Sequence, residues 1–132
     1  MVINPDVSFY EYMHMYIENF RKMAKMIESY IGEEASGMGY YRLMVDVANY
    51  APYFNKKVEA SNKNETEFWK KIIENGMQNG EIKKDLDIDT LANHFQWLQE
   101  GIALNSIFAG NAKIIYKLLE KTFNQLYKCI KM

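Results

Sequence analysis

The chain has 132 residues, a length that suits one domain with a real hydrophobic core. Its 16 basic and 17 acidic residues are interspersed, which argues against a DNA-binding surface on this chain alone. A single cysteine, Cys129, excludes an intramolecular disulfide framework and fits a reducing compartment. No apolar run approaches the roughly 20 residues of a membrane span, and residues 1–6 lack signal-peptide features. We therefore expect a cytoplasmic chain without membrane contact.

Apolar residues recur at helical spacing along almost the whole chain, which predicts an all-α fold. Ser8 and Glu11 have the spacing of a capping box, and the helix that they begin should run to about Glu34. The glycines that follow predict a break. A second helix is expected over about 40–51, where apolar side chains again keep a helical period.

Pro52 suits the first turn of a third helix, which should reach Asn79. Within that helix the polar run 61–64 has poor helix propensity and is expected to interrupt it. Gly80 is placed to end the helix with a left-handed residue, and Asp87 is placed to cap the next helix.

The fourth helix should run to about Ala109, and a fifth should run from Ala112 to near the end of the chain. A turn at Gly110 and Asn111 separates them. The order of elements predicts one domain, residues 1–132, built as an antiparallel bundle of about five helices.

The junction between the third and fourth helices carries the most distinctive pattern in the chain. Two glycines four residues apart are followed by an acidic, an apolar and a basic residue, then an Asp-Leu-Asp turn, and later a Glu-Gly pair. The residues are Gly76, Gly80, Glu81, Ile82, Lys83, Asp85, Leu86 and Asp87, followed by Glu100 and Gly101 in the next helix.

This pattern resembles the C-terminal regulatory domain of the TetR/AcrR family of transcription regulators. The resemblance implies a helical domain that binds a small effector and forms a homodimer. In that family a DNA-binding helix-turn-helix precedes the regulatory domain, and no part of this chain corresponds to it. Operator DNA would therefore be bound only through an N-terminal domain that this chain lacks.

The last two helices are apolar over more surface than one core requires. The fourth has two apolar stripes, and about half of the fifth is apolar, whereas a helix that faces one core needs an arc of only about 100°. A second copy of the chain would cover the surplus, and the resemblance points to the same two helices. The alternative is a fourth helix buried centrally in a monomer. The expected interface residues are Trp97, Gly101, Leu104, Phe108, Ile115, Leu118, Leu119, Thr122 and Leu126.

No residue pattern indicates a catalytic or metal site. Glu11 and His14 match one Glu-x-x-His pair of the di-iron bundles, but a second pair is missing and both residues fall on a polar helix face. Cys129 falls on the apolar side of the last helix, which favours a structural thiol. We therefore expect no catalytic residue, no metal and no cofactor, and we interpret the chain as a non-enzyme.

Nine methionines and ten tyrosines are an unusual supply of adaptable and amphipathic side chains. They fit either core packing with a compositional bias or an apolar ligand cavity, because Met repacks around ligands and Tyr adds a polar group. The resemblance implies an effector between the first four helices. Periodicity, with a histidine between the two stripes, supplies the candidates: Tyr12, Met13, Tyr16, Phe20, Met44, Val47, Phe68, Ile72, His94, Phe95 and Leu98.

Two classes of function follow. The first is the regulatory domain of a TetR-like transcriptional repressor, which senses a small hydrophobic effector and mediates homodimerisation. The alternative is a free-standing helical protein-interaction module or a small helical-bundle enzyme. The coding sequence upstream of Met1 would discriminate, because a basic helix-turn-helix of about fifty residues there would support the first class.

Overall fold

The computed structural model describes residues 2–31, 45, 46, 49, 52–108 and 114–132. Within them it is helical, with one isolated backbone bridge between Ile82 and Lys131 and no strand. The all-α prediction is confirmed for this part of the chain. Val45, Asp46 and Asn49 are helical, but the rest of the helix expected over about 40–51 lies outside the described residues. The named helices are α1 (Phe9–Ile31), α3 (Pro52–Gln78), α4 (Ile88–Phe108) and α5 (Ile115–Ile130).

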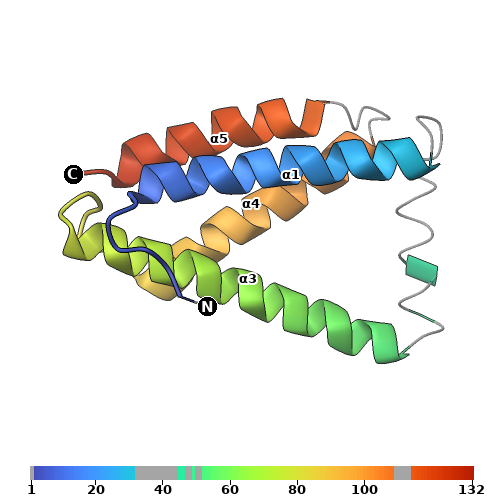
Figure 1. Ribbon diagram of the computed structural model, residues 1–132, viewed down its shortest axis with the longest axis horizontal. Helices are drawn as coiled ribbons and strands as arrows, with labels where there is room; N and C mark the ends of the chain where they lie inside the picture. Colours follow the sequence, from blue (N-terminus) through green and yellow to red (C-terminus); the bar gives the residue numbers. More distant parts are fainter. Residues whose placement is uncertain (1, 32–44, 47–48, 50–51, 109–113) are drawn as a thin grey trace.

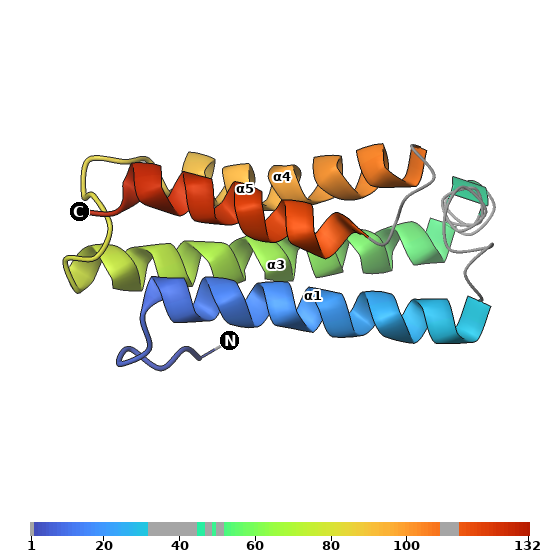
Figure 2. The same cartoon turned by 90° about the horizontal axis from the view of Figure 1, so that it is seen from above.

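The four helices pack in a closed ring of neighbours: α1 on α3, α3 on α4, α4 on α5, and α5 on α1. Figures 1 and 2 show that each helix runs antiparallel to its neighbours in this ring. The start of α1, the end of α3, the start of α4 and the end of α5 lie at one end, on the left of Figure 1. From that end α1 and α3 diverge, so the space between them widens along the bundle.

An aromatic cluster fills the centre of the bundle. The ring of Trp69 from α3 stacks on Phe95 of α4, with centroids 4.7 Å apart, and meets the edge of Phe123 of α5 at 5.6 Å. Phe9 of α1 lies 5.3 Å from Phe95. All four side chains are fully buried. Burial of each such aromatic side chain contributes about 1.5–3 kcal/mol to the stability of the fold. Because each of the four helices supplies one of these side chains, the cluster holds all four helices together.

The expected caps are present. Ser8 and Glu11 form the capping box: Ser8 N–H donates to the Glu11 carboxylate at 3.1 Å, and Glu11 N–H donates to Ser8 Oγ at 3.0 Å. The carboxylate of Asp87 accepts the backbone N–H of Thr90 at 3.0 Å, together with the Thr90 hydroxyl. These two hydrogen bonds lower the pKa of Asp87.

Gly80 ends α3 with a φ of 76°, as expected. The N–H of Glu81 donates to the carbonyl of Gly76 at 2.8 Å, and the N–H of Gly80 donates to that of Met77 at 3.2 Å. This pair of bonds is a Schellman motif. It turns the chain back so that the Ile82 side chain lies against Gly76 of the same helix, where a Cβ atom would stand 2.7 Å from Ile82 Cδ1.

Glu81 joins the ends of two other helices. Its carboxylate accepts the first N–H groups of α1, from Phe9 at 2.8 Å and Tyr10 at 3.1 Å, and the hydroxyl of Tyr127 in α5 at 2.9 Å. Its backbone carbonyl accepts the N–H of Met132 at 2.9 Å. A carboxylate at a helix N-terminus satisfies unpaired donors and suits the positive end of the helix dipole.

The break expected within α3 is wrong. The helix is continuous through the polar run 61–64. The carbonyl of Asn62 accepts the Thr66 hydroxyl at 2.9 Å and the side-chain amide of Gln96 in α4 at 3.3 Å. Tertiary contact with α4 therefore outweighs the weak local propensity of this run.

Candidate functional site: a pocket between α1, α3 and α4

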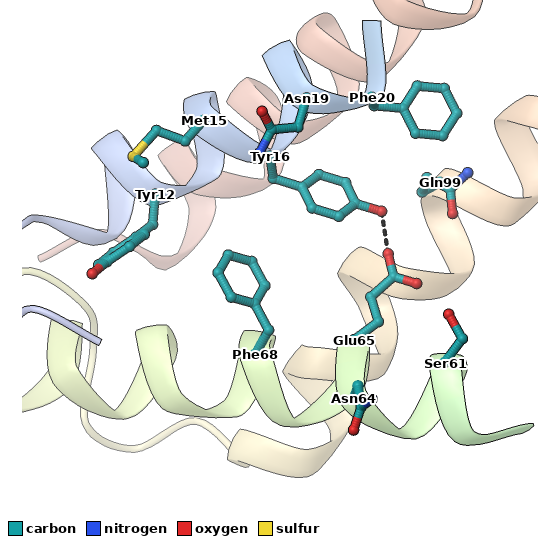
Figure 3. Close-up of a pocket in the computed structure, with 10 residues that line it drawn as sticks. All are labelled: Tyr12, Met15, Tyr16, Asn19, Phe20, Ser61, Asn64, Glu65, Phe68 and Gln99. Carbon is teal, nitrogen blue, oxygen red and sulfur yellow. Dashed lines mark hydrogen bonds between the residues drawn. The ribbon is translucent and has the colours of Figure 1, made fainter. Parts of the chain in front are cut away.

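A pocket of about 580 Å³ lies where α1 and α3 diverge, with α4 behind them (Figure 3). Its volume falls within the range of about 300–1,000 Å³ that is usual for small-molecule sites. At the other end of the two helices, Gly76 of α3 allows Phe9 of α1 to approach closely: a Cβ atom at Gly76 would stand 3.3 Å from Phe9 Cβ. The lining residues of this α1–α3–α4 pocket are Tyr12, Met15, Tyr16, Asn19, Phe20, Ser61, Asn64, Glu65, Phe68 and Gln99.

Aromatic rings form much of the pocket wall. Phe68 of α3 lies between two tyrosines of α1, with its centroid 6.2 Å from that of Tyr12 and 6.2 Å from that of Tyr16. Phe68 and Tyr16 also contact the buried ring of Trp69, at 5.3 Å and 4.8 Å. The wall is therefore continuous with the core, and its position is fixed by core packing.

One hydrogen bond between polar side chains joins α1 and α3 at the pocket. The hydroxyl of Tyr16 donates a hydrogen bond to the carboxylate of Glu65, from α1 to α3 (Figure 3). Burial first, and then the hydrogen bond and the negative charge of Glu65, raise the pKa of Tyr16. The phenol therefore stays protonated and acts as a donor.

A second carboxylate lies near the first. Burial and the charge of Glu65 raise the pKa of Glu100 in α4, and a hydrogen bond from Gln96 partly opposes this rise. Ion pairs between described residues join Arg21 to Glu18, and Lys70 to Glu67 and Asp89. None of them includes Glu65, the charged residue of the pocket lining, whereas Glu100 is exposed and does not line the pocket.

The residues expected to bind a ligand are divided between several places. Four of them line the pocket: Tyr12, Tyr16, Phe20 and Phe68. Three others are buried in the core: Met13, Ile72 and Phe95. His94 is exposed on α4, and Leu98 lines a different groove, between α4 and α5. Met44 and Val47 lie outside the described residues.

Sequence reasoning missed the polar part of the pocket. Ser61 and Asn64 lie in the polar run that was expected to interrupt α3, and Glu65 follows it directly. Asn19 and Gln99 are polar residues of a kind that is usual on the solvent-facing side of a helix. The available signal was the spacing of Glu65 and Phe68, which places them on one face of a helix.

A second feature is an apolar stripe on the outside of α4, formed by Trp97, Gly101 and Leu104. Trp97 is 62% exposed and Leu104 is 38% exposed. A Cβ atom added at Gly101 would meet nothing within 4 Å. The alternative that α4 is buried on all sides within a monomer is therefore wrong. The side chain of Phe108 lies outside those that the structure describes.

The α5 residues expected at an interface face in different directions. Ile115 and Leu119 are buried in the single chain and retain almost no surface for a partner. Leu118 is 38% exposed. Thr122 and Leu126 are partly exposed and line a groove of about 510 Å³ between α4 and α5, with Leu98, Lys121, Gln125 and Cys129.

The described residues contain no group of three or more His, Cys, Asp or Glu side chains that would hold a metal ion. Glu11 is used in the capping box, and His14 Nε2 lies 3.3 Å from Asn124 Oδ1 in α5. Among the helices described, none has the length and apolar character needed to cross a membrane.

Comparisons of the chain with protein-family models, with curated proteins and with solved structures found no match. The resemblance to the TetR/AcrR regulatory domains therefore depends on the motif around Gly76, Glu81 and Asp87 and on the order of the helices.

Proposed function

We propose that this chain is the effector-sensing and dimerisation domain of a TetR-like transcriptional repressor, and that the α1–α3–α4 pocket receives the effector. The observation that carries the proposal is the pocket itself. It has the volume of a small-molecule site, four aromatic residues in its lining and a tyrosine–glutamate pair that gives it a polar side. This composition suits a mostly apolar molecule with one polar group.

The helix α4 supports the proposed link between sensing and dimerisation. Gln99 of α4 lines the pocket, whereas Trp97 and Gly101 on the same helix belong to the exposed stripe. A ligand that favours one position of α4 would change the surface offered to a second copy. In a dimer that change would alter the spacing of attached DNA-binding domains, which is a coupling free energy between two sites.

Ligand binding can be tested directly on this chain. Small aromatic molecules should raise its melting temperature, because a ligand that binds only the native state stabilises it. Phe20→Ala should weaken such binding about tenfold, which corresponds to about 1.4 kcal/mol, since it removes one aromatic wall. Tyr53→Ala is the matched control, because Tyr53 is an exposed aromatic outside the pocket lining. No thermal shift with any apolar probe would contradict the proposal.

The regulatory role has a separate test. The coding sequence immediately upstream of Met1 should encode a basic helix-turn-helix of about fifty residues. The longer protein should then bind a pseudo-palindromic operator as a dimer, whereas this chain alone should not shift that operator at physiological salt. An upstream sequence without such a segment would instead favour a free-standing interaction module or a small helical-bundle enzyme.

A further inference from the structure

The carboxylate of Glu65 occupies an unusual position in the pocket. It lies half-buried in a lining that otherwise holds four aromatic residues, one methionine and four uncharged polar residues. Its described hydrogen-bond donor is the neutral phenol of Tyr16. No ion pair between described residues includes it. A carboxylate that is partly removed from water without a cationic partner costs free energy, and a bound cation would offset that cost.

A second and independent feature is the aromatic lining. Tyr12, Tyr16, Phe20 and Phe68 all line the pocket, from α1 and α3. Figure 3 shows the Tyr16 and Phe68 rings side by side next to the Tyr16–Glu65 hydrogen bond. The faces of aromatic rings attract ammonium groups, and several rings lining one site are an arrangement used to recognise quaternary ammonium ligands.

The surrounding charge agrees with these two features. Glu65 is the one charged residue in the pocket lining, so the pocket wall carries negative and not positive charge. A carboxylate, phosphate or sulfonate ligand would meet repulsion from Glu65. A neutral ligand would leave the charge of Glu65 unbalanced.

We propose that the pocket selects lipophilic cations: molecules with an apolar or aromatic body and an ammonium group placed against Glu65 and the Tyr16 ring. This inference rests on one part of the proposed function, namely that the pocket binds a ligand, and it does not depend on the regulatory role. It narrows the class of effector from hydrophobic molecules in general to positively charged ones.

Two probes of nearly the same shape test the charge preference. Benzyltrimethylammonium carries the positive charge, and neopentylbenzene is its neutral carbon analogue. A Trp97→Phe chain leaves Trp69 as the single tryptophan, whose ring lies 4.8 Å from Tyr16, so its fluorescence reports on the pocket. We expect the cation to bind about tenfold more tightly than the neutral analogue.

Variants identify the group responsible. Glu65→Gln removes the charge while keeping an acceptor for Tyr16, and it should reduce the affinity for the cation about tenfold without weakening binding of the neutral analogue. Glu74→Gln is the control, because Glu74 is an exposed glutamate of the same helix that does not line the pocket. It should leave both affinities unchanged.

The outcomes separate the two proposals. Equal affinity of the unmodified pocket for the two probes, or a preference for the anion 3-phenylpropionate, would overturn the cation inference and leave an apolar ligand site in place. An unchanged cation affinity in Glu65→Gln would also overturn it. Failure of both benzyl probes and of all apolar molecules to bind would overturn the ligand site itself.

Discussion

At Gly76, Phe9 of α1 and Ile82 of the loop after α3 both pack tightly against α3. A Cβ atom there would stand 2.7 Å from Ile82 Cδ1 and 3.3 Å from Phe9 Cβ. Gly76→Ala should therefore destabilise the fold by about 1–3 kcal/mol through overpacking. This loss would exceed the gain of about 1 kcal/mol that alanine brings to a helix interior. Urea denaturation would measure the change.

The matched control is Ile82→Val, which removes the atom in closest conflict. Combined with Gly76→Ala it should give a double variant that loses less stability than the sum of the two single changes, because the two sites share one contact. Simple additivity would show that this contact is not the reason for the glycine.

Tyr127 makes the fold sensitive to alkaline pH. Burial, followed by the hydrogen bond to Glu81, raises its pKa from 10.0 to about 12. Below pH about 10 the phenol is protonated in both the folded and the unfolded chain, and its contribution to stability is complete. Above that pH the unfolded chain loses the proton first, so stability should fall between pH about 10 and about 12.

Tyr127→Phe tests this titration. The variant should be less stable than the unmodified chain at pH about 8, because the hydrogen bond to Glu81 is lost, but its stability should fall less steeply toward pH about 11. Tyr16, whose pKa is also raised, remains as a source of the residual slope. Urea midpoints across this pH range are the measurement, and identical slopes in the two proteins would contradict the assignment.

The residues that could be predicted from sequence are those whose partners are near in the chain. The capping box of Ser8 and Glu11, the left-handed Gly80 and the cap at Asp87 are fixed by spacings of a few residues, and all are present. The role of Glu81 was not predictable in the same way. Its partner Phe9 is 72 positions away, and a contact of that range depends on the tertiary fold.

At the level of elements, Glu81 ties the start of α1 to the end of α5. Glu81→Ala removes the acceptor for the N–H groups of Phe9 and Tyr10 and for the Tyr127 hydroxyl. The loss should be about 1–3 kcal/mol, because partly buried donors would be left unsatisfied and a charge would leave the helix N-terminus. Amide exchange of Phe9 and Tyr10 should become faster than that of the α3 amides.

Two comparisons make the Glu81 result specific. Glu81→Gln keeps an acceptor but loses the charge, so its stability should be intermediate. Glu74→Ala removes an exposed glutamate of α3 and should change stability by no more than about 0.5 kcal/mol. Equal effects of Glu81→Ala and Glu74→Ala would show that the helix-end contacts contribute nothing measurable.

The helices themselves were largely predictable, because helical periodicity records which face of each helix is buried. The break expected at 61–64 shows the limit of that reasoning. Local helix propensity takes no account of the hydrogen bond that the side-chain amide of Gln96 in α4 donates to the carbonyl of Asn62. This tertiary contact stabilises a stretch of helix that propensity alone disfavours. The same limit applies to the pocket. Periodicity cannot distinguish Phe95, which fills the core, from Phe68, which also borders the open space.

For the whole molecule, the stripe of Trp97, Gly101 and Leu104 is exposed in the single chain. We expect α4 and α5 to pair with their counterparts about a two-fold axis, through an apolar interface that buries on the order of 1,500 Å² or more. Trp97, the most exposed large apolar side chain of the stripe, is the expected hot spot. Sedimentation as a monomer at micromolar concentration would contradict this arrangement.

Gly101 offers the sharpest test of that dimer, because the single chain gives no reason for a glycine there. Since an added Cβ meets no atom within 4 Å, Gly101→Ala should stabilise an isolated chain by about 1 kcal/mol through helix propensity. If two copies of α4 approach closely at this residue, the same change should weaken association, and Gly101→Glu should dissociate or aggregate the protein by adding bulk and charge. Sedimentation equilibrium and thermal unfolding over a range of protein concentrations separate the two effects. A Gly101→Ala chain that is more stable and dimerises unchanged, or a Gly101→Glu chain that stays a well-behaved dimer, would place the interface elsewhere.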